Sequence, residues 1–363
     1  MSETLPLIFG APLTYVQRAG ILAEAGPHLA GLGKRVLALI DPLVRDQVEL
    51  ALSNTCEREG IACSIAIFPG ECTQAAVDAL AANSQAFGPD AVLAAGGGKA
   101  LDTGKLVAET LGVPAAMVPT IASTDAPTSR VAVLYTEAHA QDRVVRLRAN
   151  PALVLVDTAI IARAPVRFLV AGMGDALATW PEARACAAGG GRTPIGGSPS
   201  QAALALAELC YRTVLEHGRA ARRDVIAQHV TQALERVIEA NILLSGLGFE
   251  SGGLAAAHSL YAGLSALAAG AGFLHGEKVA FGVLVQSWLE GWPTEERDQL
   301  CRLYRDVGLP TSLSAIGLGE ASRKDMEAVA VIACRPGSHM HNLPRPVSME
   351  QLIEVLEKLR RAD

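Results

Sequence analysis

Hydrophobic and polar positions in the first half of the chain alternate between short apolar runs and longer amphipathic segments. The apolar runs are rich in β-forming residues, and each is followed by a segment of helical periodicity that ends at a glycine. The predicted strands are 35–41, 63–70, the start of 90–112, and 113–120, and the helices between them occupy 42–60, 73–88 and the rest of 90–112. Such alternation predicts a parallel α/β sheet with helical crossovers, as in a Rossmann-like domain.

The pattern changes after the apolar stretch 152–165. From Arg167 onward, apolar-periodic segments follow one another without a convincing strand, for example at 199–217, 222–247, 276–291 and 349–361. The segment 187–200, with five glycines and two prolines, predicts an irregular loop. We therefore expect an α/β domain over 1–164 and an all-α domain over 165–363.

The composition is that of a globular protein with room for two domains. The chain has 363 residues, whereas single cores stop growing at roughly 250–300 residues. Half of the residues are apolar and 19% are charged. A net charge of −6 and a pI near 5.8 argue against a surface for polyanions, so nucleic acid is not an expected partner.

The cysteines and the N-terminus predict a cytoplasmic protein. Seven cysteines are scattered without a CxxC pair, which is typical of reduced thiols. The first residues, Met1 to Thr4, lack the basic stretch and apolar core of a signal peptide.

One segment, 251–274, carries no formal charge and is long enough to cross a bilayer. It is dominated by Gly, Ala and Ser, contains His258, and has no flanking cluster of Lys or Arg. We predict a buried, tightly packed helix pair here, and no membrane partner.

Asp175, His258 and His275 are the candidate metal ligands. Each lies in a Gly/Ala-rich setting with few charges, where a lone polar group would be costly. Two imidazoles and one carboxylate leave one tetrahedral position of zinc open, as in catalytic sites. The alternatives are core histidines with other partners, and an Asp175 that caps a helix over 176–185. His339 and His341 could form a second pair of metal ligands, but their irregular segment favours residues that line the substrate pocket or simply belong to a loop.

The glycine turn at 96–98, in GGGKALDTGK (96–105), lies between a predicted strand and a predicted helix. Such a turn exposes backbone N–H groups to a phosphate, with Lys99 near the charge. The spacing matches neither GxGxxG nor a Walker A motif, so a tight strand–helix connection is an equal alternative.

Two further features favour a nucleotide site. Asp41 ends the strand 35–40, where a carboxylate can accept hydrogen bonds from a ribose and repel a 2′-phosphate. Its alternative is a turn at Asp41-Pro42 that leads into the next helix. The polar run 119–135 follows a buried strand and carries Asp125, which either binds a polyol hydroxyl or forms a local turn.

Taken together, these segments closely resemble the glycerol dehydrogenases of the iron-containing (group III) alcohol dehydrogenase superfamily. The matching stretches are GGGKALDTGK, PTIASTDAPTS, NPALVLVDT, GMGDALATW-EARA, GFESGGLAAAHS and HGEKVAFGVLVQ, in order along the chain. The resemblance implies a dehydroquinate-synthase-like fold: an N-terminal NAD-binding domain and a C-terminal helical domain, with the active site in the cleft between them. It also implies a homo-oligomer, often an octamer.

The resemblance also assigns residues. It places the zinc ligands on Asp175, His258 and His275, with Fe²⁺ or another divalent metal as the alternative ion, and a polyol contact on Asp125. It places the NAD contacts on Asp41, Gly97, Gly98, Lys99, Asp102, Thr120, Ser123, Ser129, Val131 and Tyr135. The chain departs from the family pattern at Tyr261, where many relatives have a histidine, and at Pro181. Neither change removes a ligand, but both could reshape the pocket.

The expected reaction is reversible oxidation of a small vicinal diol, with glycerol to dihydroxyacetone as the type reaction. A metal- and NAD-using dehydroquinate-synthase-type enzyme would need clustered Lys and Arg, whereas the stretches with the two histidines contain Lys278 alone. A glycerol-1-phosphate dehydrogenase would need a phosphate pocket. A non-catalytic sensor would leave buried ligands unused.

Overall fold

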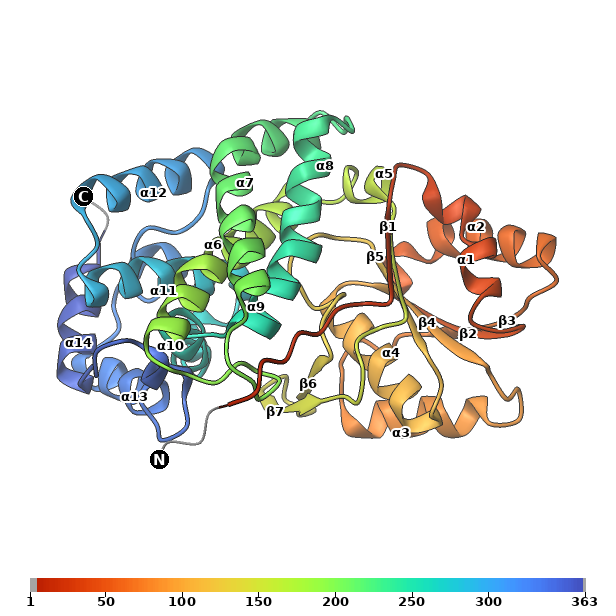
Figure 1. The fold of residues 1–363 in the computed structure, drawn as a ribbon, viewed down its shortest axis with the longest axis horizontal. Coiled ribbons are helices and arrows are strands. Elements are labelled where there is room, and N and C mark those ends of the chain that lie inside the picture. The colour runs from red at the N-terminus through yellow and green to blue at the C-terminus, as the bar shows by residue number, and fades with distance from the viewer. Residues whose placement is uncertain (1–4, 362–363) are drawn as a thin grey trace. The chain divides into compact units, whose positions relative to one another are not determined.

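The computed structural model describes residues 5–361, so the expectation drawn from Met1 to Thr4 lies outside the described residues. The chain forms two compact units, and it passes between them more than once (Figure 1). We call Gly10–Pro165 with Asp224–Gly246 the sheet unit, and Met1–Phe9 with Val166–Arg223 and Leu247–Asp363 the helical unit.

The sheet unit contains a six-stranded sheet in which every pairing is parallel. The strand order is β1-β8-β5-β4-β2-β3. The strands are β1 (Thr14–Gln17), β2 (Arg35–Ile40), β3 (Ala62–Ile67), β4 (Ala91–Gly96), β5 (Ala115–Pro119) and β8 (Leu153–Val156). The predicted α/β class and its predicted strands are confirmed.

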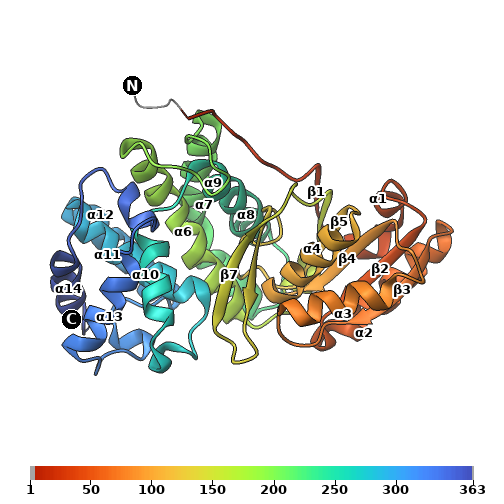
Figure 2. The same ribbon diagram turned by 90° about the horizontal axis from the view of Figure 1, so that it is seen from below.

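Helices cover both faces of this sheet, and its inner strands β2, β4, β5 and β8 are accordingly almost wholly apolar. On β2, Val36, Ala38 and Ile40 share one core with α1 (Gly26–Ala30) and α2 (Arg45–Arg58), together with the short helix η1 (Ile21–Glu24). Leu37 faces the opposite core, with α3 (Gln74–Ser84) and α4 (Gly98–Leu111). Figure 2 shows α3 and α4 lying along the strands. Two short elements, η2 (Pro42–Val44) and α5 (Thr158–Ile161), follow β2 and β8.

The polar run 119–135 ends in a hairpin that the sequence did not predict. The strands β6 (Val131–Tyr135) and β7 (Gln141–Arg146) pair antiparallel. The exposed, charged residues of β7 lack the apolar alternation that identifies a strand.

A helical segment from late in the chain also belongs to the sheet unit. It comprises α8 (Gln232–Glu239) and a π-helical turn, η3 (Ala240–Leu244). Asn241 Nδ2 donates to the carbonyl of Ala122 at 3.0 Å, and Thr128 Oγ1 donates to the carbonyl of Ile242 at 3.0 Å. These side-chain bonds tie the segment to the polar run.

The helical unit confirms the predicted all-α second half, since none of the strands described between residues 5 and 361 lies in it. Its helices are α6 (Val166–Ala188), α7 (Gln201–Ile226), α9 (Ser245–Gly252, which begins in the sheet unit), α10 (Ala256–Ser265), α11 (His275–Glu290), α12 (Thr294–Val307), α13 (Arg323–Ala333) and α14 (Met349–Lys358). Short helical turns are η4 (Ala268–Gly270), η5 (Ser314–Ile316) and η6 (His339–Asn342).

Two sequence expectations in this unit are wrong. The predicted segments 199–217 and 222–247 have the wrong bounds, because α7 runs through Gly218 to Ile226; an added Cβ at Gly218 would lie 3.3 Å from Met173 Sδ. The helix pair expected over 251–274 is a single α-helix, α10, followed by the η4 turn. Over the part of the chain that the structure describes, no helix has both the length and the apolarity to cross a membrane.

Helices α6, α10 and α11 pack at backbone distance because glycines occupy their contacts. A Cβ added at Gly276 on α11 would lie 1.8 Å from the carbonyl oxygen of Ala171 on α6. A Cβ added at Gly282 would lie 2.7 Å from the carbonyl oxygen of Ala257 on α10. Any larger side chain must therefore push these helices apart.

Changing Gly276 to Ala tests this packing. We expect a loss of about 3 kcal/mol or more in the free energy of unfolding, because the rigid backbone carbonyl of Ala171 cannot move aside. Denaturant unfolding followed by circular dichroism measures it. Gly272→Ala is the matched control, since no atom lies within 4 Å of the added Cβ. Equal stability of the two variants would contradict the packing argument.

Candidate functional site

Asp175, His258 and His275 come together within the helical unit, as the sequence predicted that metal ligands would. Asp175 lies on α6, His258 on the first turn of α10, and His275 at the start of α11. One ligand atom from each residue lies within 4.8 Å of the other two. The glycines at the contacts of α6 with α11 and of α11 with α10 let the three helices come close enough for these side chains to meet.

The spacing of the ligand atoms fits a small tetrahedral cation. Nε2 of His275 lies 3.2 Å from Oδ1 of Asp175, and Nε2 of His258 lies 3.5 Å from the same oxygen. Bonds of about 2.0–2.1 Å at tetrahedral angles place two ligand atoms roughly 3.3 Å apart. Both contacts therefore match the separation across a shared zinc-sized ion.

The polar atoms of the site are unusual for a buried position. Asp175 is 1% exposed, and neither of its carboxylate oxygens accepts a hydrogen bond of normal geometry from residues 5–361. A carboxylate buried without such partners is costly. The side chains of His258 and His275 are 16% and 29% exposed, so one side of the cluster stays accessible. A divalent cation would satisfy the carboxylate and still leave an accessible coordination position.

The electrostatics of the cluster agree with a cation site. Burial alone would raise the pKa of Asp175, but the imidazoles of His275 and His258 together hold it below its ordinary value. Burial alone would lower the pKa of His258, but the carboxylates of Glu182 and Asp175 raise it well above its ordinary value. The site therefore attracts positive charge.

The alternative interpretation of Asp175 as a helix cap is wrong. The residue lies in the middle of α6, which begins at Val166. The helix also continues through Pro181, so the apolar stretch after Asp175 is not a new helix.

Tyr261 packs directly on the cluster. Its ring meets the ring of His275 edge-on, with 4.2 Å between the centroids. Nζ of Lys278 lies 5.9 Å from the Tyr261 ring centre and donates to Oγ of Ser265 at 3.3 Å. The Tyr261 ring therefore forms a wall beside His275.

His339 and His341 do not join a second cluster of this kind. They lie on η6, where the ring Nε2 of His341 is 3.2 Å from the carbonyl oxygen of Arg335. Burial lowers the pKa of His339. Within residues 5–361, the one group of three convergent ligand-type side chains is that of Asp175, His258 and His275.

In the sheet unit, several predicted cofactor residues lie at the carboxyl ends of the neighbouring strands β2, β4 and β5. Gly97 and Gly98 begin α4 after β4. The amide of Asp41 donates to the carbonyl of Ala95 at 2.9 Å, and the amide of Thr120 donates to the carbonyl of Gly96 at 3.1 Å. This edge is where open parallel sheets bind ligands.

The turn at Gly96 is so close to Asp41 that no side chain fits. Gly96 has a φ of +155°, and an added Cβ would lie 2.8 Å from Cβ of Asp41. Oδ1 of Asp41 also accepts a hydrogen bond from the amide of Leu43 at 2.9 Å, which is the turn that the sequence offered as the alternative. A ribose contact by the same carboxylate stays a prediction.

Lys99 has an acidic partner that sequence reasoning missed. Its Nζ lies 2.6 Å from Oε2 of Glu71 and 4.4 Å from the centre of the Tyr135 ring. Nδ1 of His139 lies 2.6 Å from the same Glu71 oxygen. Burial opposes ionisation of Glu71, but Lys99 and His139 together lower its pKa. No local motif around Glu71 indicates these contacts.

Asp102 and Lys105 form a buried ion pair beneath the polar run. Nζ of Lys105 lies 2.8 Å from Oδ1 of Asp102, whose Oδ2 accepts from the amide of Val133 at 2.9 Å. Lys105 also donates to three carbonyls, those of Ala126, Ser129 and Val131. The pair therefore holds the segment that carries the predicted contacts Ser129 and Val131.

Asp125, the predicted polyol contact, also lies in the sheet unit. Its Oδ2 accepts a hydrogen bond from Oγ of Ser245 at 2.8 Å, and its carbonyl accepts one from Oγ1 of Thr128 at 3.2 Å. Ser123, two residues earlier, is buried. The hydroxyl of Ser245 orients the Asp125 carboxylate.

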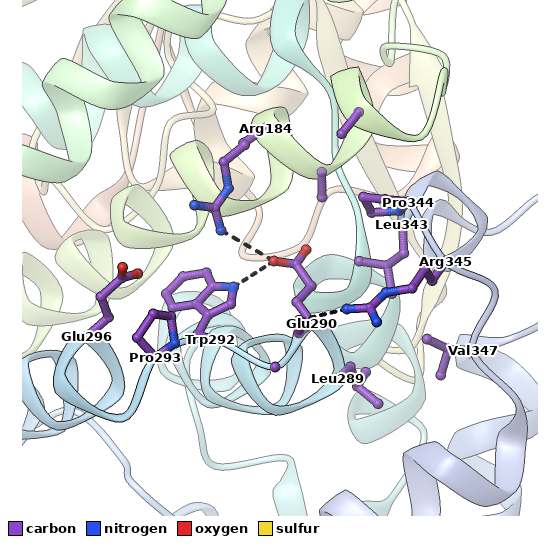
Figure 3. Close-up of a pocket in the computed structure, with 13 residues that line it drawn as sticks. Arg184, Leu289, Glu290, Trp292, Pro293, Glu296, Leu343, Pro344, Arg345 and Val347 are labelled. Atoms are coloured by element: carbon purple, nitrogen blue, oxygen red, sulfur yellow. Dashed lines mark hydrogen bonds and ion pairs between the residues drawn. The ribbon is translucent and has the colours of Figure 1, made fainter.

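A cavity of about 390 Å³ lies in the helical unit, and Arg184, Glu290 and Trp292 are among the residues that line it (Figure 3). Arg184 and Trp292 both donate to Oε2 of Glu290, at 3.3 and 2.6 Å, and Arg345 donates to its carbonyl. These four polar residues thus satisfy one another. None of the metal, cofactor or substrate residues predicted from the sequence lines it.

Comparison with known proteins supports the resemblance. The family model for iron-containing alcohol dehydrogenases matches residues 12–158. A glycerol dehydrogenase from Pseudomonas putida is 48% identical over 95% of both chains, and a glycolaldehyde reductase from Halobacterium salinarum is 41% identical over 96% of both. The crystal structure of glycerol dehydrogenase from Schizosaccharomyces pombe superposes with a TM-score of 0.93 at 32% identity, covering 99% of this chain and 91% of that one.

The similarity runs through both units, and the fold, with its parallel sheet and its helical unit, is that of the S. pombe enzyme. The chain is therefore an oxidoreductase that belongs to the glycerol dehydrogenase family of the iron-containing alcohol dehydrogenases.

Proposed function

We propose that this protein catalyses the reversible, NAD-dependent oxidation of glycerol, or of a similar small vicinal diol, to the matching hydroxyketone, dihydroxyacetone in the case of glycerol. The observation that carries the proposal is the cluster of Asp175, His258 and His275, with Nε2 atoms 3.2 and 3.5 Å from one carboxylate oxygen. The glycerol dehydrogenases among the relatives support the substrate class. Zinc is the proposed ion, with Fe²⁺ or another divalent metal as the alternative.

Asp175, His258 and His275 would hold the cation and leave one coordination position for the substrate. Such an ion supplies Lewis acidity that lowers the pKa of a substrate hydroxyl. Asp175 contributes the buried negative charge that holds the ion. The partial exposure of His258 and His275 leaves an approach for a small polar molecule, and the ring of Tyr261 bounds that approach on the His275 side.

The sheet unit contributes the proposed cofactor site. The backbone N–H groups of Gly97 and Gly98 at the start of α4 are suited to the pyrophosphate of NAD, because they combine hydrogen-bond donors with the positive end of the helix. The carboxylate of Asp41 would accept hydrogen bonds from the adenosine ribose and repel the 2′-phosphate of NADP. Lys99, paired with Glu71, adds little net positive charge there.

Asp125 is proposed to orient the substrate through its second hydroxyl. The hydrogen bond from Ser245 fixes the direction in which the Asp125 carboxylate points. Positioning of this kind is the protein's main contribution to hydride transfer, since the cofactor carries the redox chemistry.

A second candidate substrate is a two-carbon hydroxyaldehyde. The glycolaldehyde reductase from Halobacterium salinarum, at 41% identity, supports reduction of such a molecule by the same site. We further propose that the enzyme works in the cytoplasm as a homo-oligomer. A panel of glycerol, 1,2-propanediol, ethylene glycol, dihydroxyacetone and glycolaldehyde, assayed by NADH absorbance, ranks the substrates.

Replacing Asp175 by Asn tests the metal site. The amide keeps the shape but removes the charge, so zinc content should fall below about 0.1 per chain and diol oxidation should be lost. Metal analysis and NADH production measure the two effects, while NADH binding, followed by fluorescence, should persist. Asp306→Asn, an exposed aspartate of the helical unit, is the control. An Asp175→Asn protein that retains stoichiometric zinc and full activity would refute the metal proposal.

Replacing Asp41 by Ala tests the cofactor preference. The variant loses the ribose acceptor and the repulsion of a 2′-phosphate, so we expect the ratio of kcat/KM for NAD to that for NADP to fall by about tenfold or more. Asp46→Asn, an exposed aspartate on the following helix, should leave the ratio unchanged. If the NAD-to-NADP ratio of kcat/KM is unchanged in Asp41→Ala, Asp41 serves only as the cap of the turn at Leu43.

A further inference from the structure

Glu182 is a buried carboxylate that none of the sequence motifs identified as functional. It lies on α6 two helical turns after Asp175, on the same face of the helix, and it is fully buried. An isolated carboxylate in such a place is costly unless several donors surround it. Glu182 has three donors, and all of them come from residues at the start of α10.

Both oxygens of Glu182 are used. Oε1 accepts from the amide of Ala255 at 2.8 Å and from the amide of His258 at 2.9 Å. Oε2 lies 2.5 Å from Nδ1 of the His258 ring. The carboxylate thus holds the backbone and the side chain of the same histidine, while Nε2 of that ring is directed toward Asp175.

These bonds replace a helix cap that the sequence of α10 lacks. The N-cap position is Ala255, which has no side chain able to accept a hydrogen bond. Glu182 accepts hydrogen bonds from the amides of Ala255 and His258. Oε1 of Gln286 on α11 accepts hydrogen bonds from the amides of Ala256 and Ala257, at 3.1 and 3.2 Å. The first turn of α10 is therefore positioned by its neighbours, and its positive end favours the charge of Glu182.

The bond to Nδ1 decides which ring nitrogen of His258 can bind a cation. A carboxylate accepts but cannot donate, so the proton of a neutral His258 must lie on Nδ1. Nε2 then carries a lone pair toward Asp175, at the position that the proposed ion would occupy. Buried carboxylates that accept from the far nitrogen of a ligand histidine raise the affinity for the metal.

We propose that Glu182 is a positioning residue of the metal site, which fixes His258 as an Nε2 ligand and adds a second buried negative charge beside the ion. This inference rests on the proposed function, because it requires that Asp175, His258 and His275 bind a divalent metal. It concerns a residue that would not touch the metal itself.

The test is Glu182→Gln in the full-length protein. The amide oxygen of Gln can still accept from both backbone amides, so the capping role is kept. Its NH₂ group must face Nδ1 and can only donate there, which moves the ring proton of His258 to Nε2 and blocks the lone pair. We expect the zinc dissociation constant, measured by chelator competition, to rise about 10–100-fold, with the melting temperature of the zinc-free protein nearly unchanged.

The matched control is Asp157→Asn. Asp157 is also buried and also accepts hydrogen bonds from backbone amides, those of Gly20, Leu22 and Ala159, but it lies in the sheet unit and none of these donors is a proposed ligand. The zinc affinity of this variant should equal that of the unmodified protein. In NMR spectra of [¹⁵N]histidine-labelled, zinc-free protein at a pH where His258 is neutral, His258 should carry its proton on Nδ1 in Asp157→Asn and on Nε2 in Glu182→Gln.

A zinc dissociation constant in Glu182→Gln within about threefold of the unmodified value would overturn the inference. If the variant fails to fold, the unmodified zinc-loaded protein decides instead: His258 protonated on Nδ1 supports the inference, and His258 protonated on Nε2 overturns it. The two proposals fail differently. If the unmodified protein binds no metal, both the proposed function and the role of Glu182 are refuted. If zinc is lost in Asp175→Asn but not in Glu182→Gln, the role of Glu182 alone is refuted.

Discussion

The close contact of α11 with α6 is the constraint on which the proposed metal site depends. Gly276, which follows His275 in the sequence, lies against the carbonyl of Ala171. Gly174, which precedes Asp175, lies against the carbonyl of Gly276. Asp175 and His275 thus each have a neighbouring glycine that lets the two backbones approach. With side chains at these positions, the helix axes would move apart, and Nε2 of His275 could not lie 3.2 Å from the Asp175 carboxylate.

The same geometry explains why a buried carboxylate is tolerated on α6. Asp175 has two imidazoles opposite it, and Glu182, two turns further along the helix, has the amide-rich start of α10. Pro181 lies between the two acids without ending the helix, and its carbonyl accepts from Nε2 of Gln286 at 3.2 Å. Gln286 bonds the first amides of α10 through its other amide atom, so one side chain links three helices.

Much of the architecture, and the three convergent ligands, could be predicted from the sequence, because strand–helix alternation and isolated polar residues in apolar stretches are local signals. The parallel sheet and the grouping of Asp175 with His258 and His275 followed from them. Glu182 was also within reach, since it follows Asp175 by two turns of a predicted helix. Glu71 and Lys105 were not, because their roles depend on contacts with residues far along the chain. The β6–β7 hairpin was missed because β7 is exposed and charged, and the segment predicted at 199–217 ended too early because α7 continues through Gly218.

All three proposed ligands belong to one compact unit, and they come from three separate helices of it. A cation there would therefore act as a crosslink, joining stretches that are distant along the chain much as a disulfide does in secreted domains. The seven thiols form no disulfide among the described residues, so the bound metal would be a reversible crosslink in a chain without disulfides there. Metal supply would then govern how long the helical half of each molecule survives proteolysis, as well as whether it turns over substrate.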